Sequence, residues 1–446
     1  MIDPAVNPGR VGQNRVMASP VSPPRGMRDF LPADKAHRER VLGVIRETYR
    51  AHGFDEIETP VMEDSARLHA GLGGDNEKLA FAVLKRGLTT DDLRDAPEPL
   101  TLADLGLRFD LTVPLARFYA SHRAELPSVF RAIQIAPVWR AERPQKGRYR
   151  QFMQCDIDII GEAGPLAEVE LIVATVATLG ALGLDGATIR INDRRLLTSS
   201  LTVFGFPADI HDAVLVTIDK LDKIGASGVV AELRERGYPP VPIDALEKFF
   251  ARPGASEPAS GALSFGEASI LAALPDGVDP IAVAELAALG ETVIAITGSP
   301  VVQFDPWLVR GMGYYTGTIF EVAHPSQSYS LGGGGRYDGM IGRFLGTDVP
   351  AAGFSLGFER IVDLVDLPDG ATRDATALVH DADVPTTQLA TLQAEMIAGG
   401  SRVRLERKPR NLAPLLEQLA AGGFDRVAFV TTEVTSVDDL TFRLLR

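Results

Sequence analysis

The chain of 446 residues is poor in cysteine: it has one, Cys155. A single cysteine excludes an intramolecular disulfide framework and is typical of a reducing compartment. The seven histidines are scattered singly, so the sequence offers no protein motif for a zinc site. It also lacks an apolar run long enough to span a bilayer, and its polar start has no apolar core of a secretory signal. We therefore expect a cytoplasmic protein without a membrane partner, with residues 1–22 as a disordered leader.

Positive charge is also in the minority, with 45 Lys and Arg against 59 Asp and Glu and a formal net charge of −14. This balance argues against a general nucleic-acid coat and against DNA as a partner, but it leaves room for a local basic surface that meets RNA. Residues 138–158, VWRAERPQKGRYRQFMQCDID, reverse the sign of the charge. Such a local reversal indicates a place where an anion is held.

Within that segment, apolar residues favour strands on both sides of a Pro-Gln-Lys-Gly turn. The pattern predicts two antiparallel strands joined by a basic loop. Alternation along a strand would place Arg140 with Glu142 on one face, and Arg148, Arg150 and Phe152 together on another. Guanidinium groups and an aromatic ring suit a nucleotide. A solvated charged hairpin is the alternative, and this segment alone does not decide between them.

Patterning along the chain predicts several domains, in line with the length. Residues 202–300 contain successive helical segments separated by Pro/Gly stretches, and residues 367–374 have the composition of a linker. Alternating strands and helices beyond the linker predict a small α/β domain. We expect a main α/β domain over 23–201 and 301–366, a helical insertion over 202–300, and a terminal domain over 375–446.

Local patterns in the main domain predict individual elements. Residues 54–61 alternate as a strand broken by Pro60, which belongs at a sheet edge or a bulge. Residues 88–100 are polar and acidic, which predicts a surface loop. Further strands are expected over 78–85, 105–110 and 187–192, and helices over 36–52 and 167–182.

Three separated segments resemble the signature motifs of class II aminoacyl-tRNA synthetases. Residues 52–63, HGFDEIETPVME, resemble motif 1, and the basic hairpin, with Arg140-x-Glu142 and then Arg148 and Phe152, resembles motif 2. Residues 353–360, GFSLGFER, resemble motif 3. The three occur in order and at family-like spacing, which chance explains poorly.

Further segments are similar to those of histidyl-tRNA synthetases in particular. They are the amino-acid-binding strand LRFDLTVP (107–114), the histidine-recognition motif RGMGYYTG (310–317) and the glycine-rich GGGGRYD (332–338). The resemblance covers roughly residues 24–365. It implies a class II antiparallel sheet flanked by helices, with a helical insertion and a short, divergent anticodon-binding-like domain at the end.

The resemblance implies that ATP, with Mg²⁺, activates L-histidine to histidyl-adenylate, and that histidine then passes to the 3′ end of tRNA(His). Arg140 and Arg310 would be catalytic at the α-phosphate, where Arg310 takes a role that a metal ion fills in related enzymes. The implied ATP-binding residues are Arg140, Glu142, Arg148, Phe152 and Arg360. The implied histidine-binding residues are Asp110, Thr112, Gln154, Asp158, Arg310, Tyr314 and Tyr315.

Plainer interpretations remain beside these roles. Asp110 could cap a turn, the glycine run could be a loop, and Tyr314 and Tyr315 could be ordinary strand aromatics. Cys155 is expected in the core or a pocket wall. The basic residues of 402–410 could meet an RNA backbone or form a solvated edge.

Two rival functions also remain. One is a noncatalytic, histidine-binding regulatory subunit of ATP phosphoribosyltransferase. That function predicts loss of the motif arginines, but Arg140, Arg148, Arg310 and Arg360 are all present. The other is a paralogue that passes histidine to a non-tRNA acceptor. Met312-Gly313 stands where many members have Leu-Asp, so a carboxylate is absent from the histidine motif. Because motif 1 builds a dimer interface in this family, we also expect a homodimer.

Overall fold

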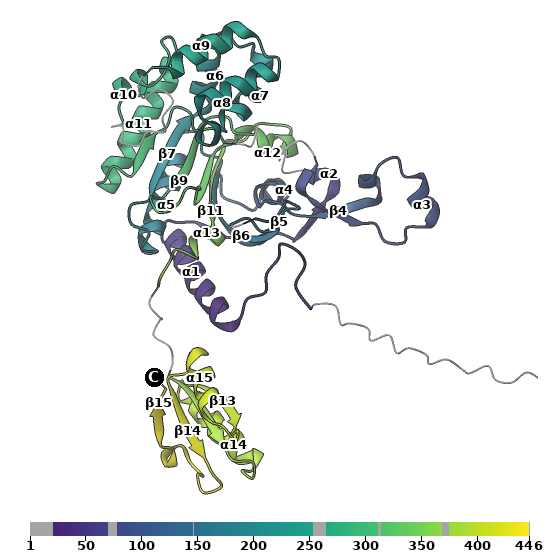
Figure 1. Cartoon of the computed structure of the whole chain (residues 1–446), viewed down its shortest axis with the longest axis vertical. Coiled ribbons are helices and arrows are strands. Elements are labelled where there is room, and N and C mark those ends of the chain that lie inside the picture. The colour runs from purple at the N-terminus through teal and green to yellow at the C-terminus, as the bar shows by residue number, and fades with distance from the viewer. Residues whose placement is uncertain are drawn as a thin grey trace, which may run out of the picture.

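The computed structural model describes residues 21–69, 78–145, 147–252, 265–310, 314–367 and 374–445. Most of the predicted leader and linker therefore lies outside the described residues, as do Met312 and Gly313. Figure 1 shows a large body and, beyond the linker, a smaller one. The arrangement is the mixed α/β class that the sequence predicts.

The large body is built on an eight-stranded sheet in the order β1-β5-β6-β11-β10-β9-β7-β8. The six inner strands pair antiparallel, whereas β1 and β8 at the edges pair parallel with their neighbours. The strands are β1 (Asp55–Glu56), β5 (Phe130–Trp139), β6 (Gln151–Ile160), β7 (Thr188–Asp193), β8 (Val302–Phe304), β9 (Thr318–Ala323), β10 (Gly332–Arg336) and β11 (Ala351–Gly357).

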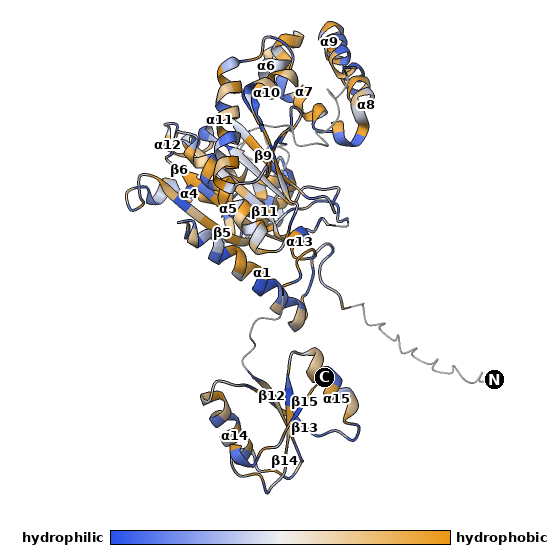
Figure 2. Cartoon of the chain, turned by 90° about the vertical axis from the view of Figure 1, so that its left-hand side faces the viewer, coloured by the Kyte–Doolittle hydropathy of each residue, from blue (hydrophilic) through white to orange (hydrophobic). Residues whose placement is uncertain are grey.

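One face of this sheet is covered by helices α1 (Pro32–Ala51), α5 (Leu166–Ala181) and α11 (Pro280–Thr297), with α13 (Phe358–Ile361) after β11. Alternation along β6 sends Cys155, Ile157 and Ile159 into this core, where each is fully buried. Figure 2 shows the hydrophobic residues gathered on the central strands and α5. The opposite face of β6 is therefore free to carry polar side chains.

The other side of the large body holds α4 (Thr112–His122), α12 (Asp338–Leu345), and a small antiparallel sheet β2-β4-β3. Its strands are β2 (Met62–Asp64), β3 (Phe81–Leu84) and β4 (Ala103–Leu107), with α2 (Ser65–Leu68) after β2. The loop expected over 88–100 was wrong in part, because α3 (Thr90–Asp95) and a 3₁₀ helix (Pro99–Leu102) form there. Thr89 and Asp92 make a capping box that stabilises α3 although none of its residues is buried.

The strand expected over 54–61 is also much shorter in the structure. Only Asp55 and Glu56 pair with β5, at the sheet edge, and the chain leaves the sheet before Pro60. Ile57 still donates from its N–H to the carbonyl of Ile133 at 3.0 Å, and the chain then turns to pair in the small sheet from Met62 onward, with Pro60 in the connection between the two sheets.

The helical stretch after β7 comprises α6 (Arg194–Phe204), α7 (His211–Ile218), α8 (Leu221–Glu235), α9 (Pro240–Phe250), α10 (Glu267–Ala272) and α11. It does not pack as one unit. Helices α6 to α9 share a core with Trp307, whereas α10 and α11 join the core behind the main sheet. By length and composition alone α11 is apolar enough to cross a membrane, although we expected no run of the chain to be so. It buries Val283, Leu286 and Val293 against that core, as a core helix does.

The smaller body has a four-stranded sheet in the order β13-β12-β14-β15. Strand β12 lies parallel to both neighbours, and β15 is antiparallel to β14. Two separate apolar clusters cover its two faces, one under each helix. The elements are β12 (Ala375–His380), α14 (Thr386–Ala398), β13 (Arg402–Arg407), α15 (Ala413–Ala421), β14 (Arg426–Val430) and β15 (Phe442–Leu444).

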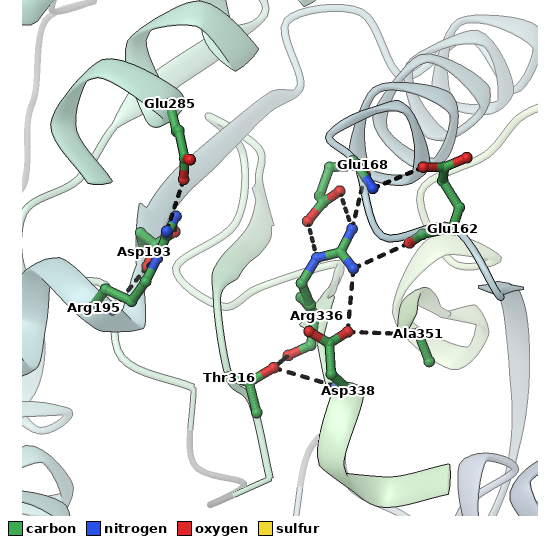
Figure 3. Close-up of polar contacts among 10 residues, drawn as sticks. Glu162, Glu168, Asp193, Arg195, Glu285, Thr316, Arg336, Asp338 and Ala351 are labelled. Atoms are coloured by element: carbon green, nitrogen blue, oxygen red, sulfur yellow. Dashed lines mark hydrogen bonds and ion pairs between the residues drawn. The ribbon is translucent and has the colours of Figure 1, made fainter. Parts of the chain in front are cut away.

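A buried ion pair ties the glycine-rich strand β10 to α5. Arg336 at the end of β10 donates from Nε and Nη2 to the two oxygens of Glu168, at 2.6 and 2.7 Å, and from Nη1 to Asp338 at 3.1 Å. Figure 3 shows Asp338 in turn accepting a hydrogen bond from the backbone of Ala351 in β11. Strands β10 and β11 are thereby held in register next to α5, and Tyr337 is fixed between the two anchored residues.

Candidate active site

A cleft of about 840 Å³ opens on the face of the main sheet opposite α1 and α5. Strands β6, β11, β10, β9 and β7 form its floor, and the loop between β5 and β6 forms one wall. All twelve residues named from the sequence line it: Asp110, Thr112, Arg140, Glu142, Arg148, Phe152, Gln154, Asp158, Arg310, Tyr314, Tyr315 and Arg360. Segments up to 250 residues apart in the chain therefore meet in one place.

The floor follows from the period of β6. Phe152, Gln154, Asp156 and Asp158 alternate with the buried apolar residues, so all four face the cleft. Strand β11 pairs Gly353 with Asp158, and a Cβ at Gly353 would lie 2.0 Å from the Asp158 carboxylate. Glycine is therefore required there for the carboxylate to occupy its position.

The wall formed by the basic loop is less regular than the sequence predicts. Arg140 donates from Nε to the carbonyl of Phe109 at 2.9 Å, and its guanidinium lies 5.1 Å from the centre of the Phe152 ring. Arg150 does not line the cleft with Arg148, because it donates to the backbone carbonyl of Glu142 instead. Strand β6 begins only at Gln151, so strand alternation does not extend back to Arg148 and Arg150.

Two arginines, Arg148 and Arg360, lie close enough in the cleft to influence each other's charge. Arg360 lies with its guanidinium 5.2 Å from the Tyr329 ring and donates to the carbonyl of Ser330. Burial lowers the pKa of Arg360, and the nearby positive charge of Arg148 lowers it further. Arginines that disfavour one another's charge in this way gain stability when an anion binds between them.

The cleft also contains the buried carboxyl groups of Asp156 and Asp158. Asp158 accepts a hydrogen bond from the Tyr337 hydroxyl at 2.6 Å, and burial raises the pKa of Asp158 to about 7. Burial and the charge of Asp158 also raise the pKa of Asp156 well above its usual range. Two carboxyl groups of this kind are poised to exchange hydrogen bonds with a ligand that can both donate and accept.

Further aromatic and polar side chains line the cleft together with these carboxyl groups. The rings of Tyr314 and Tyr315 lie 4.7 Å apart, and Tyr337 meets Tyr314 edge-on at 6.0 Å. Gln154 donates to the Ser355 hydroxyl at 3.1 Å, while its buried Oε1 has no partner among the described residues. Asp110 accepts from the backbone N–H of Val113 at 3.1 Å, so the capping role considered from the sequence is present alongside its place in the cleft.

Several residues of the cleft were not given a role from the sequence: Asp156, Arg190, Glu321, Tyr337 and Ser355. Asp156 and Tyr337 stand inside recognised motifs, and the period-two pattern of β6 could have found Asp156. Nothing in the sequence marks Arg190 or Glu321, because they are brought to the cleft by the pairing of β7 with β9.

A largely antiparallel sheet whose cleft is lined by the arginines of the motif 2 and motif 3 segments has the architecture of a class II aminoacyl-tRNA synthetase. The family model for histidyl-tRNA synthetase matches residues 26–361. The chain belongs to the histidyl-tRNA synthetase family.

Relatives match over nearly the whole length. A histidine–tRNA ligase of Leifsonia xyli is 60% identical over 94% of this chain and 98% of its own, and a probable histidine–tRNA ligase of Tropheryma whipplei is 44% identical over 91% and 95%. The crystal structure of a histidyl-tRNA synthetase from Nostoc superposes with a TM-score of 0.71 at 25% identity, over 92% of this chain and 91% of that one. A Bacillus halodurans protein, titled as an ATP phosphoribosyltransferase regulatory subunit/histidyl-tRNA synthetase, has the same TM-score at 21% identity, over 93% and 99%, and shares the fold.

Proposed function

We propose that this chain is a histidine–tRNA ligase that forms histidyl-adenylate from L-histidine and ATP and transfers histidine to the 3′ end of tRNA(His). The observation that carries the proposal is that one cleft brings together four arginines, Arg140, Arg148, Arg310 and Arg360, with buried carboxyl and tyrosine groups. The 60% identity to a histidine–tRNA ligase over 94% of the chain supports it.

Arg140, Arg148 and Arg360 suit the phosphates and adenine of ATP, with Phe152 beside Arg140 and Glu142 beside Arg148. In the first step a carboxylate oxygen of histidine attacks the α-phosphorus, an O–P bond forms, and the bond to the β-phosphate oxygen breaks to release pyrophosphate. Arg140 and Arg310 would stabilise the charge that develops on the α-phosphoryl oxygens. Alignment and charge stabilisation are what such a step requires.

Asp158 and Tyr315 would bind the two nitrogens of the substrate imidazole, and we add Tyr337 as the residue that orients Asp158. Asp110, Thr112 and Tyr314 would hold the rest of histidine, with Gln154 between amino acid and phosphate. A buried polar site of this kind rejects amino acids that lack the matching hydrogen bonds, because its own groups would be left unpaired.

Mg²⁺ would enter as the ATP complex. Among the residues that the structure describes, no group of three or more His, Cys, Asp or Glu side chains is close enough to form a protein cage for it. Mg²⁺ keeps most of its waters and is held chiefly by substrate phosphates, so a cage is not required.

The small body offers a surface for tRNA. Arg402 and Arg404 lie with their guanidinium groups 4.5 and 4.7 Å from the centre of the Phe424 ring, and Arg426 lies 4.4 Å from that of Phe442. Guanidinium groups held over aromatic rings suit stacking with unpaired bases as well as phosphate contact. Such a surface would serve a ligase that recognises tRNA.

We further propose a cytoplasmic homodimer. Val61 and Met62, at the end of motif 1, and Leu84 and Leu105, in the small sheet β2-β4-β3, are exposed apolar side chains. Exposed apolar side chains that gather in one area mark a protein interface. Light scattering should give twice the 47.9 kDa chain mass for the wild type. A double variant with Met62→Glu and Leu105→Glu should give the mass of a single chain.

Histidine-dependent exchange between ATP and pyrophosphate, followed by charging of total tRNA, tests the function. We expect both activities. Exchange without charging would indicate the paralogue that passes histidine to another acceptor. Absence of exchange would favour the noncatalytic regulatory subunit.

A further inference from the structure

Glu321, on the cleft face of β9, lies between two arginines. Its Oε2 accepts a hydrogen bond from Nη1 of Arg310 at 3.0 Å, and its Oε1 accepts from Nη2 of Arg190 at 2.5 Å. The three side chains are 22%, 16% and 19% exposed for Arg310, Glu321 and Arg190, so solvent screens the charges only in part. One carboxylate is thus divided between the arginine proposed to act at the α-phosphate and a second arginine with no role so far.

Arg190 is itself held in place. Its Nη1 lies 2.9 Å from a carboxylate oxygen of Asp305, which is buried and accepts a hydrogen bond from the backbone of Trp307. The same nitrogen lies 3.5 Å from Asp222 in α8, so the helical stretch contributes a further charge. Strand β7, which carries Arg190, pairs with β8 on one side and β9 on the other. These supports give Arg190 one position from which it can fix Glu321.

Arg310 has little room of its own. A Cβ at Gly333 would lie 2.6 Å from Nη1 of Arg310, so the glycine strand closes one side of the guanidinium and Glu321 holds that same nitrogen. If Arg190 were absent, both oxygens of Glu321 would be free to form a bidentate pair with Arg310. That pair would turn Arg310 away from the phosphate and neutralise its charge.

We propose that Arg190 is a positioning residue for adenylate formation: by holding one oxygen of Glu321, it restricts that carboxylate to a single contact with Arg310 and keeps Arg310 directed at the α-phosphate. The inference rests on the proposed function. Arg190 has no contact with a substrate in this role. Its removal should therefore slow the chemical step more than it weakens histidine binding.

The first test is Arg190→Met, which keeps the length and apolar stem of the side chain. We expect kcat of ATP–pyrophosphate exchange to fall about 10²-fold, as a small displacement of a catalytic group does, with KM for histidine changed much less. Arg190→Lys should recover part of the rate. The matched control is Arg131→Met, which removes a comparable arginine–glutamate pair, with Glu170, outside the cleft; its exchange rate should equal that of the wild type.

A second substitution separates positioning from mere support of the fold. In the Arg190→Met background, Glu321→Gln removes the carboxylate charge that would capture Arg310, so exchange should recover by about tenfold or more. A structural loss would instead be deepened by the second change. A wild-type exchange rate in Arg190→Met, or no recovery of exchange in the Arg190→Met/Glu321→Gln double variant, would overturn the inference but leave the proposed function standing. Absence of exchange in the wild-type protein would overturn the proposed function and the inference with it.

Discussion

At the scale of single residues, Arg310 carries the sharpest expectation. It lies at the cleft wall with Glu321 as its ion-pair partner. Arg310→Ala should lower histidine-dependent exchange by about 10² to 10³-fold, because a preorganised charge donor is lost from the transition state. Thermal unfolding should show that the variant is folded.

The control for that loss is Arg94→Ala. Arg94 belongs to an exposed pair with Asp91 on α3, away from the cleft, and such pairs add little to stability. Near-normal exchange in Arg310→Ala, or an equal loss in Arg94→Ala, would contradict the role assigned to Arg310.

Asp158 gives a pH-dependent prediction for the ligand-free protein. Burial raises its pKa to about 7, against about 3.9 in the unfolded chain. Between these values the native state holds a proton that the unfolded state has lost, so the contribution of Asp158 is complete at about pH 4 and is lost as pH rises through 7. Relative to Asp158→Asn, the free energy of unfolding of the wild type should fall by a few kcal/mol over this range, on the order of 1.4 kcal/mol per unit.

Urea unfolding of both proteins from pH 4.5 to 8 measures this difference. Tyr337→Phe removes the hydrogen bond that favours the charged carboxylate, and so should extend the fall in stability to higher pH. A difference between wild type and Asp158→Asn that stays constant with pH would show that Asp158 titrates normally.

At the scale of elements, the glycines of β10 are set by close approach to the neighbouring strands. A Cβ at Gly334 would lie 1.9 Å from the carbonyl oxygen of Gly353 in β11, whereas a Cβ at Gly339 in α12 would meet no atom within 4 Å. Gly334→Ala should therefore cost more than about 2 kcal/mol of stability. Gly339→Ala should be neutral or stabilise by up to about 1 kcal/mol, since alanine favours a helix.

Chemical denaturation of the two variants checks this contrast, with Gly339→Ala as the matched control for the substitution itself. Equal effects would mean that β10 and β11 can separate without cost. The result bears on function as well, because Gly333 and Gly353 bring the same strands against Arg310 and Asp158.

At the scale of the whole molecule, the small body has its own apolar clusters on both faces of its sheet. A chain that ends at residue 367 should retain ATP–pyrophosphate exchange and lose about tenfold or more in tRNA charging, because the cleft lies wholly in the large body. Circular dichroism of residues 374–446 should show a cooperative unfolding transition. Loss of exchange in the shortened chain would show that the large body needs the small one.

The local sequence determined much of the site. The family resemblance marked Gln154 and Asp158, and period-two alternation puts both on the same face of β6 as Phe152, which follows from strand geometry whatever the neighbours are. The motifs likewise marked Arg140, Arg310 and Arg360, and all three line the cleft. Arg150 was misplaced because the start of a strand depends on pairing: β6 begins only at Gln151, and the N–H of Arg150 bonds to the carbonyl of Gly26.

What only the tertiary structure decided are the contacts between strands far apart in the chain. Glu321 meets Arg190 because β7 pairs with β9, and Tyr337 meets Asp158 because β10 and β6 both flank β11. Likewise α10 and α11 join the main core rather than the other helices of their stretch. Periodicity reports which face of an element is apolar, but not which element covers it. The sequence by itself therefore determined the chemistry of the cleft, and the tertiary structure decided which groups hold its catalytic arginine and its buried acid in place.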